Sequence, residues 1–240
     1  MAGEGPEAKA PGPWFLRAPF ESLRLGCYTR RMAKDPTNRA AERFNEVCTI
    51  RIELLESAPP IWRRVDVPTS VTLKLLHEIV QIVMDWQNYH LWEFTVGARR
   101  YGIPSDEDYG DTPLFDGANI RLRDVLRRKV AVLDYTYDFG DNWELRLTAT
   151  DVRQREPNVS YPRYIDGERN GPPEDCGGIY GFYDKLEARR DRRHPDHRDV
   201  SRWLGNYDAA KIDTFRMRHF LAQIAKRRKA GRARWDTEKA

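Results

Sequence analysis

The sequence predicts an α+β fold: a mostly antiparallel sheet, a buried helix after the first hairpin, and a C-terminal helical segment packed on one side. Three observations lead to this prediction. Apolar and polar residues alternate over 48–54 and 61–67, and strands are also read over 130–137 and 143–152. A helical period covers 72–86. The remaining helical patterns gather in the last third of the chain, and strands followed by helices are typical of α+β domains.

The first hairpin is read from two short alternating stretches. Cys48, Ile50, Ile52 and Leu54 alternate with polar residues, which predicts a strand over 48–54. A turn with two prolines follows, and a second strand is expected over 61–67, ending at Pro68.

The next elements follow from changes of period. Apolar residues recur at steps of three and four after Thr72, and they predict a largely buried helix. Further strands are expected at 90–96, 100–103, 130–137 and 143–152, a loop at 105–117, and a mixed segment at 120–126 that turns helical. A glycine-rich loop is expected over 166–178, and helices near 179–191, 196–204 and 208–228.

The chain divides into three parts by composition. Residues 1–45 are expected to form an N-terminal extension, a partly disordered arm in which Asp35-Pro36 begins a short helix. Residues 46–228 form the α+β domain, and 229–240 a basic tail. A domain of this size buries enough surface to fold without a disulfide or a metal.

Cysteine usage and hydropathy exclude several classes. Cys27, Cys48 and Cys176 lie far apart and form no CxxC pair, which argues against a zinc ribbon or a disulfide framework. We expect free thiols and a cytoplasmic protein. No apolar run approaches the ~18 residues that indicate a membrane span, so no membrane partner is expected.

Residues 134–143, DYTYDFGDNW, join two predicted strands and are expected to form a hairpin. The DFG triplet also occurs in protein kinases, but the other kinase motifs are missing here. Gly140 is expected to adopt positive φ, with Asn142 tolerating it. On that basis Gly140→Val is expected to cost about 1–2 kcal/mol or more.

Four acidic residues are the candidate binding or metal cluster: Asp138, Asp141, Glu174 and Asp175. Hard divalent cations such as magnesium or calcium bind carboxylate oxygens, so these residues form a cation site if their loops converge. The alternative is that each acts locally, Asp138 and Asp141 at the turn, Glu174 and Asp175 at the following helix N-terminus.

Other acidic residues and the histidines are weaker candidates. A second acidic loop contains Asp106, Glu107, Asp108 and Asp111. His77 is expected in the core, bonded to backbone, and His90 is expected to orient a loop. His194 and His197 are expected in a solvated loop.

Basic residues are concentrated at the C-terminus. Residues 211–240 contain ten Lys or Arg against three Asp or Glu, in a chain of net charge +4. The candidate phosphate contacts are Lys226, Arg227, Arg228 and Lys229. Such clusters neutralise phosphates without reading sequence, and no helix-turn-helix or zinc-finger pattern accompanies them. The expected partner is nucleic acid, or another protein.

Several motifs together resemble a known family. They are TLKLLHEIV (72–80), NYHLWEF (88–94), YDFGDNWEL (137–145), GPPEDCGG (171–178) and RWLGNYDAAKIDTF (202–215). The chain resembles the Ri-plasmid ORF-three-like family over about 46–228. The resemblance implies an α+β fold and a loose association with mobile DNA. Family members often carry a histidine where this chain has Leu145, which puts a cation site built on that histidine in doubt.

Two function hypotheses follow. The first is a non-enzymatic binding or interaction module, because no nucleophile–base pair or full ligand set is readable. Its core or groove would contain the aromatic residues Trp62, Trp92, Tyr135, Tyr137 and Trp143. The second is a divalent-metal-dependent enzyme acting on nucleic-acid phosphodiesters, with the acidic cluster holding the metal and the basic tail holding the phosphate backbone.

Overall fold

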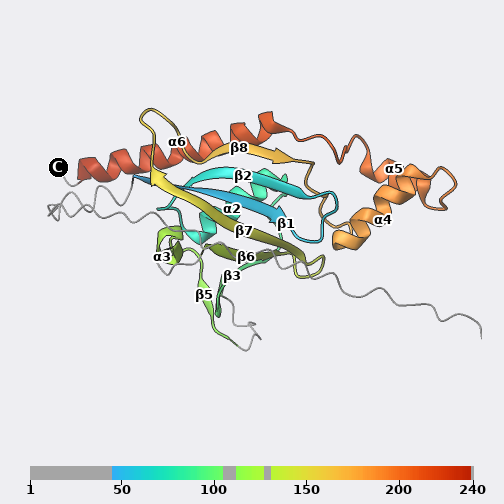
Figure 1. Ribbon diagram of the computed structural model, residues 1–240, viewed down its shortest axis with the longest axis horizontal. Helices are drawn as coiled ribbons and strands as arrows, with labels where there is room; N and C mark the ends of the chain where they lie inside the picture. Colours follow the sequence, from blue (N-terminus) through green and yellow to red (C-terminus); the bar gives the residue numbers. More distant parts are fainter. Residues whose placement is uncertain (1–44, 105–111, 127–130, 239–240) are drawn as a thin grey trace, which may run out of the picture. The chain divides into compact units, whose positions relative to one another are not determined.

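The centre of the fold is one eight-stranded sheet with the order β5-β4-β3-β6-β7-β1-β2-β8 (Figure 1). The computed structural model describes residues 45–104, 112–126 and 131–238, with side chains up to residue 231. All of these residues belong to one compact unit. With the five described helices, the sheet confirms the α+β prediction.

The strands pair antiparallel throughout, except for β4 and β5, which are parallel. Their bounds are β1 Glu46–Leu54, β2 Ile61–Pro68, β3 Trp92–Val96, β4 Arg99–Gly102, β5 Leu114–Asp116, β6 Val132–Tyr137, β7 Trp143–Gln154 and β8 Arg163–Glu168. The expected first hairpin and the β6–β7 hairpin are both present, the second with Tyr137 opposite Trp143.

Helix α2, Leu73–Met84, fills one face of the sheet. Thr72 is its N-cap, and the Thr72 side chain accepts a hydrogen bond from the Leu75 amide at 3.2 Å. The apolar stripe of α2 shares one hydrophobic cluster with the inward residues of β1 and β2. The buried Arg63 of β2 donates from Nε to the Val83 carbonyl at 2.7 Å, which satisfies one of the last carbonyl groups of α2.

The remaining helices are α3 Leu122–Leu126, α4 Gly178–Arg190, α5 His197–Leu204 and α6 Thr214–Glu238. Helix α6 contacts α2 and β8 and runs along β8 (Figure 1). Its buried residues, Met217, Leu221, Ile224 and Ala225, recur at steps of four, three and one, as expected for one helix face. The expected division between residues 228 and 229 falls inside α6. Within the described residues, none of the helices has the length and apolarity that a bilayer crossing requires.

Several expected elements differ from the observed ones. Strand β8 lies where the sequence predicted the start of a glycine-rich loop, and β5 lies inside the expected loop 105–117. Helix α6 begins at Thr214 rather than near 208. The N-terminal arm, the short helix at 35–45 and the acidic residues of 105–111 lie outside the described residues.

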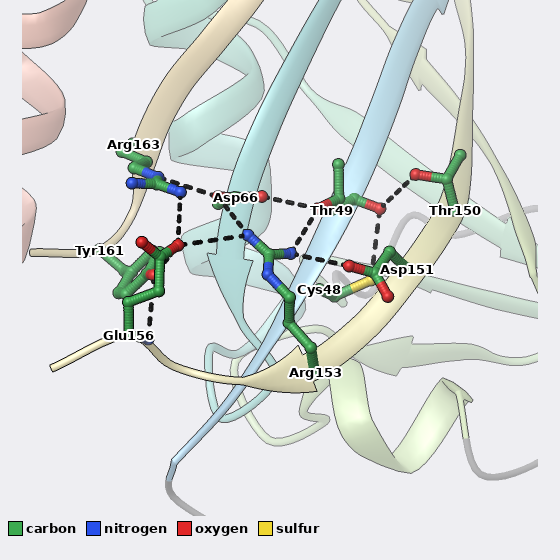
Figure 2. A network of polar contacts seen from close by, with 9 residues as sticks. All are labelled: Cys48, Thr49, Asp66, Thr150, Asp151, Arg153, Glu156, Tyr161 and Arg163. Carbon is green, nitrogen blue, oxygen red and sulfur yellow. Dashed lines mark hydrogen bonds and ion pairs between the residues drawn. The ribbon is translucent and has the colours of Figure 1, made fainter. Parts of the chain in front are cut away.

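A buried carboxylate joins four neighbouring strands on the polar side of the sheet (Figure 2). Asp66 of β2 is 1% exposed. Its Oδ1 accepts from Thr49 Oγ1 of β1 at 2.6 Å, and its Oδ2 accepts from Arg153 Nη2 of β7 at 2.7 Å and Arg163 Nε of β8 at 2.9 Å. Because each partner comes from a different strand, Asp66 fixes the order β7-β1-β2-β8 on this face.

Trp62 was expected among the aromatic residues of a core or groove, and it lies outside the core. The side chain is half-buried on the polar face, where the Arg51 guanidinium lies 4.2 Å from the ring centroid. The other four expected aromatics are buried in the core: Trp92, Tyr135, Tyr137 and Trp143.

His77 lies in the core, as expected, but it bonds to side chains rather than backbone. Its Nδ1 is 2.7 Å from the Tyr135 hydroxyl, its Nε2 faces Asn88 Oδ1 at 2.5 Å, and its ring stacks on Trp92. Burial lowers the pKa of His77 from 6.5 to about 4, although the Asn88 hydrogen bond opposes that shift.

The depressed pKa of His77 predicts a loss of stability in mild acid. The unfolded chain takes up this proton near pH 6.5, whereas the folded chain takes it up near pH 4. The free energy of unfolding therefore falls as the pH drops through this window, by at most about 3 kcal/mol. Urea unfolding at a series of pH values should show a shallower fall for His77→Gln. Equal pH dependence in both proteins would contradict the assignment.

Candidate functional site

Three loops meet where β6 turns into β7. They are residues 85–91 after α2, residues 138–142 of the hairpin, and residues 171–177 before α4. Hydrogen bonds join them directly: the Asp138 amide donates to the Leu91 carbonyl at 2.9 Å, and the Cys176 amide donates to Asp141 Oδ2 at 3.0 Å. The convergence that the acidic cluster requires is therefore present.

The backbone of the hairpin differs from the expected one. Asp138 and Asn142 adopt positive φ, at 57° and 51°, whereas Gly140 does not. Asp138 Oδ1 accepts from the Gly140 amide at 3.0 Å, and the Asp138 carbonyl accepts from the Asn142 amide at 2.6 Å. The expected φ strain in Gly140→Val is therefore wrong, because Asp and Asn carry the left-handed positions.

Asp141 caps the segment that leads into α4. Its carboxylate accepts from the amides of Cys176 and Gly177 at 3.0 to 3.2 Å. A carboxylate at this end of a helix is stabilised by the backbone dipoles. The sequence assigned this role to Glu174 and Asp175, which directly precede the helix. In the structure it is performed by Asp141, which lies 33 residues before Glu174 in the hairpin.

Glu174 is nearly buried and links its loop to the end of β6 and to residues 85–91. Its Oε1 accepts from the Tyr137 hydroxyl at 2.6 Å, and its Oε2 accepts from the Gln87 amide at 2.7 Å. Since both oxygens are engaged, Glu174 and Asp141 hold the loops together. The remaining two members of the predicted cluster are Asp138 and Asp175. Their carboxylate oxygens that face His90, Asp138 Oδ2 and Asp175 Oδ1, accept no hydrogen bond from a backbone amide among the described residues.

His90, Asp138 and Asp175 form the candidate site, which we call the His–Asp cluster. One ligand atom from each residue lies within 4.8 Å of the others. His90 Nε2 is 3.4 Å from Asp138 Oδ2 and 3.2 Å from Asp175 Oδ1. Two ligands about 2.1 Å from a tetrahedral ion lie about 3.4 Å apart, so this spacing suits a shared cation. A hydrogen bond from Nε2–H to either carboxylate satisfies the same distances.

The carboxylates in and beside the His–Asp cluster are expected to make the local potential negative. Among the described residues, neither Lys nor Arg forms an ion pair with any of the four acidic residues. Tyr89 donates to Asp175 Oδ2 at 2.6 Å, and this bond with the neighbouring carboxylates raises the pKa of Tyr89 well above its ordinary value. Burial and the bond to Glu174 raise the pKa of Tyr137 in the same direction. This potential favours a cation.

The loops around the cluster carry an unusual share of left-handed backbone. Five of the eight described non-glycine residues with positive φ lie in them: Asp85, Asn88, Asp138, Asn142 and Asp175. All five are Asp or Asn, which tolerate this conformation through local hydrogen bonds. The sequence contained this signal as Asn and Asp in short loops, but it did not identify which loops meet.

His90 was missed as a member of the site. The sequence predicted only that it orients a loop, and nothing in its neighbours distinguishes it from His194 or His197. His194 lies in the turn before α5, and His197 is the first residue of α5, where its Nδ1 faces the Ala188 carbonyl at 3.0 Å. Only the packing of residues 85–91 against the hairpin and against residues 171–177 gives His90 its two carboxylate neighbours.

The predicted phosphate contacts all lie on α6. Lys226, Arg227 and Lys229 are exposed, whereas Arg228 is half-buried and donates from Nη2 to Ser70 Oγ at 2.8 Å. The side chains of Arg232 and Arg234 lie beyond the residues whose side chains are described. The basic surface therefore includes one arginine that points toward the turn after β2.

The acidic and basic candidates lie at opposite ends of the sheet. The His–Asp cluster lies beside Trp143, the first residue of β7. The contact of Arg228 with Ser70 lies beside the other end of β7. The amide of the preceding residue, Thr69, bonds to the Glu46 carbonyl, and Glu46 pairs with Gln154, the last residue of β7. Twelve residues of β7 span roughly 35 Å. One phosphate group cannot contact both sets.

The fold and the loops define the class: an α+β domain with an acidic loop cluster at one end of its sheet. The chain belongs to the plasmid pRiA4b ORF-3-like protein family, which it matches over residues 46–216. It is 33% identical over 184 residues to the uncharacterized protein y4hQ of Sinorhizobium fredii, a match covering 75% of this chain and 92% of that one. The expected family resemblance is confirmed.

A solved structure shares the fold. The crystal structure of MM3350, a protein of unknown function from Methanosarcina mazei Go1, is 34% identical with a TM-score of 0.66. The match covers 71% of this chain and 97% of that one. Leu145, at which the resemblance expects a histidine, is fully buried in β7 opposite Tyr135. The imidazole beside the acidic loops therefore comes from His90.

Proposed function

We propose that this protein is a non-enzymatic binding module that takes up a divalent cation at the His–Asp cluster. The observation that carries the proposal is the meeting of His90, Asp138 and Asp175, from three separate loops, within 4.8 Å. One imidazole with two carboxylates suits Mn²⁺ or Zn²⁺ better than magnesium or calcium, which prefer oxygen ligands alone. The cation would neutralise the acidic loops and fix them against each other.

The surface beside the cluster supports a binding role. Tyr89, Leu91 and Phe139 are each more than half exposed and flank His90 and Asp138 in the chain. Exposed apolar side chains around a polar centre are typical of interaction surfaces. We infer that a partner protein contacts this rim when the cation holds the loops in place.

The enzymatic alternative finds less support. It required four carboxylate ligands for the metal and a basic tail that holds the phosphate backbone of the substrate. The carboxylate oxygens of Asp141 and Glu174 already accept hydrogen bonds from backbone amides and from the Tyr137 hydroxyl. The tail lies at the other end of the sheet, roughly 35 Å away by the length of β7. A binding role needs neither of these conditions.

The compartment and the genetic context are part of the same proposal. Cys48 and Cys176 are buried free thiols, and burial raises the pKa of each to about 12, which keeps them unreactive. Free thiols support a reducing cytoplasm. The association with mobile DNA rests on the family, whose description refers to a plasmid reading frame.

Calorimetric titration with Mn²⁺ and Zn²⁺ tests the proposal. The wild type should bind one ion, and Asp175→Asn, Asp138→Asn and His90→Ala should each weaken binding by about tenfold or more, because each removes one of three ligands. Both Asp residues have positive φ, which Asn tolerates, so these replacements preserve the loop backbone.

The matched control is Asp184→Asn. Asp184 is an exposed carboxylate of α4, and its replacement changes the net charge by the same amount. It should leave cation affinity unchanged. If the wild type releases no heat with either ion, or if Asp184→Asn weakens binding as much as Asp175→Asn, the cation proposal fails.

A further inference from the structure

Two arginine side chains converge on one serine at the far end of the sheet. Ser70, in the turn between β2 and α2, is buried. Arg228 of α6 donates from Nη2 to Ser70 Oγ at 2.8 Å, and Arg121, just before α3, donates from Nη1 to the Ser70 carbonyl at 2.6 Å. Two positive charges from distant parts of the chain therefore meet at a neutral residue.

A third arginine lies beside this pair. The Arg155 amide bonds to the Asn45 carbonyl at 2.7 Å, while the Thr69 amide bonds to the carbonyl of the next residue, Glu46, at 3.0 Å. This places Arg155 and the Ser70 turn on the two sides of the start of β1. Burial lowers the pKa of Arg228, and the charges of Arg121 and Arg155 lower it further. The Arg228 guanidinium is thus in the field of the other two arginines.

The three guanidinium groups have no ion-pair partner among the described side chains. Over the described part of the chain, Arg121, Arg155 and Arg228 form no ion pair with Asp or Glu, whereas their neighbours Arg153 and Arg163 both pair with Asp66. Two acidic side chains lie nearby: Glu46 Oε2 accepts from Thr69 Oγ1 at 3.4 Å, and Asp124 Oδ2 accepts from the Arg121 backbone amide at 3.4 Å. Ser70 satisfies individual N–H donors, but as a neutral acceptor it leaves the charge unbalanced.

The surrounding surface extends the positive charge. Lys226, Arg227 and Lys229 lie on the same turn of α6 as Arg228, and all three are exposed. Arg155 is also exposed, and its guanidinium donates to the Val159 carbonyl at 3.1 Å. Planar guanidinium groups with unused donors bind phosphate oxygens in bidentate geometry.

We propose that Arg121, Arg155 and Arg228 form a phosphate-binding site around Ser70, and that Lys226, Arg227 and Lys229 extend it along a phosphodiester backbone. The ligand chemistry is a phosphate oxyanion, whose negative charge replaces the carboxylate that the three arginines lack. The site is separate from the His–Asp cluster and does not depend on a cation there. It contacts phosphate only, so it distinguishes no base sequence.

Fluorescence anisotropy with a labelled 20-base-pair DNA duplex, over a series of salt concentrations, measures the proposed phosphate binding. Arg121→Gln with Arg228→Gln should weaken duplex binding by about tenfold. In a plot of log affinity against log salt concentration, the magnitude of the slope should fall in this double variant. It should fall by about one for each phosphate that the variant no longer neutralises. Arg155→Gln should weaken binding less and lower the melting temperature only slightly, because its exposed guanidinium contacts the Val159 carbonyl and the Tyr161 ring but no charged partner.

The matched control is Arg190→Gln with Arg192→Gln. These two residues are exposed, lie at the end of α4 and just after it, and remove the same charge. This control should bind the duplex nearly as well as the wild type. Arg121→Lys with Arg228→Lys keeps the charge but loses the bidentate donors, so it should bind better than the glutamine pair and less well than the wild type, which separates a charge effect from a folding defect.

Inorganic phosphate distinguishes the source of the oxyanion. If phosphate at constant ionic strength raises the melting temperature of the wild type but the duplex does not bind, the site holds a small phosphorylated ligand. If neither binds, or if the α4 control loses as much affinity as the arginine pair, the proposal is overturned. Asp175→Asn should bind the duplex like the wild type, so failure here is distinct from failure at the His–Asp cluster.

Discussion

Gly178→Ala is expected to destabilise the protein by about 2–4 kcal/mol, through two causes that act together. Gly178 begins α4 with a φ of +66°, in the left-handed region that disfavours an L side chain. A Cβ there would also lie 2.3 Å from the Asp141 carbonyl oxygen, which is backbone and cannot rotate away. The hairpin and the start of α4 must therefore separate, and the amide bonds to the Asp141 carboxylate would break.

Two neighbouring glycines provide a graded control. Gly177 has a φ of +87°, but its added Cβ meets nothing closer than 3.6 Å, so Gly177→Ala should cost only about 1–2 kcal/mol. Gly140 lacks positive φ and its Cβ meets only the Asp138 side chain at 3.2 Å, so Gly140→Ala should be nearly neutral. Chemical denaturation of the three variants should give that order. Equal losses at all three positions would contradict this account of the loop junction.

Asp66→Ala is expected to produce a loss of similar size, about 2–4 kcal/mol. The change removes the carboxylate that Thr49, Arg153 and Arg163 share, and it leaves donors from three strands without their buried acceptor. Both arginines are about one-third exposed and keep Glu156 as a partner, which holds the loss below that of a fully buried pair. Urea unfolding measures the loss. The matched control is Asp166→Ala, because Asp166 is an exposed carboxylate of β8 that pairs with Arg64 of β2.

The same residue predicts an acid effect. Burial alone would raise the pKa of Asp66, but the hydrogen bonds from Thr49, Arg153 and Arg163 outweigh burial and hold the pKa below its ordinary value. A carboxyl group with a depressed folded pKa stabilises the protein above its unfolded pKa near 4. That stability is lost as the pH falls through the folded pKa. Asp66→Asn should flatten this part of the profile, and an unchanged profile would count against the network.

The sequence was informative wherever a periodic pattern was strong. Alternation in Cys48–Leu54 predicted the inward face of β1, and the stripe after Thr72 predicted α2 with its capping residue. Strand β8 was missed because RYIDGE contains Gly and several charged residues, and its side chains are half-buried or exposed at the edge of the sheet. No pattern in such a segment separates an edge strand from a loop.

The candidate site was predicted in part. Asp138 and Asp175 were named from the sequence because acidic residues in loops are cation ligands. His90 was not, because its role depends on a contact between segments 48 and 85 residues apart. Gly140 was misread for a related reason. The turn signal was correct, but the hydrogen bonds that place positive φ on Asp138 and Asn142 depend on the pairing of whole strands.

The cation proposal is tested most directly by X-ray diffraction from crystals soaked in Mn²⁺. Anomalous scattering locates manganese without reference to any assumed ligand. The structure predicts one anomalous peak between His90 Nε2 and the carboxylates of Asp138 and Asp175, and its loss in crystals of Asp175→Asn. Crystals that show no peak at these three side chains, while manganese is bound elsewhere on the protein, would contradict the assignment of this cluster as the cation site.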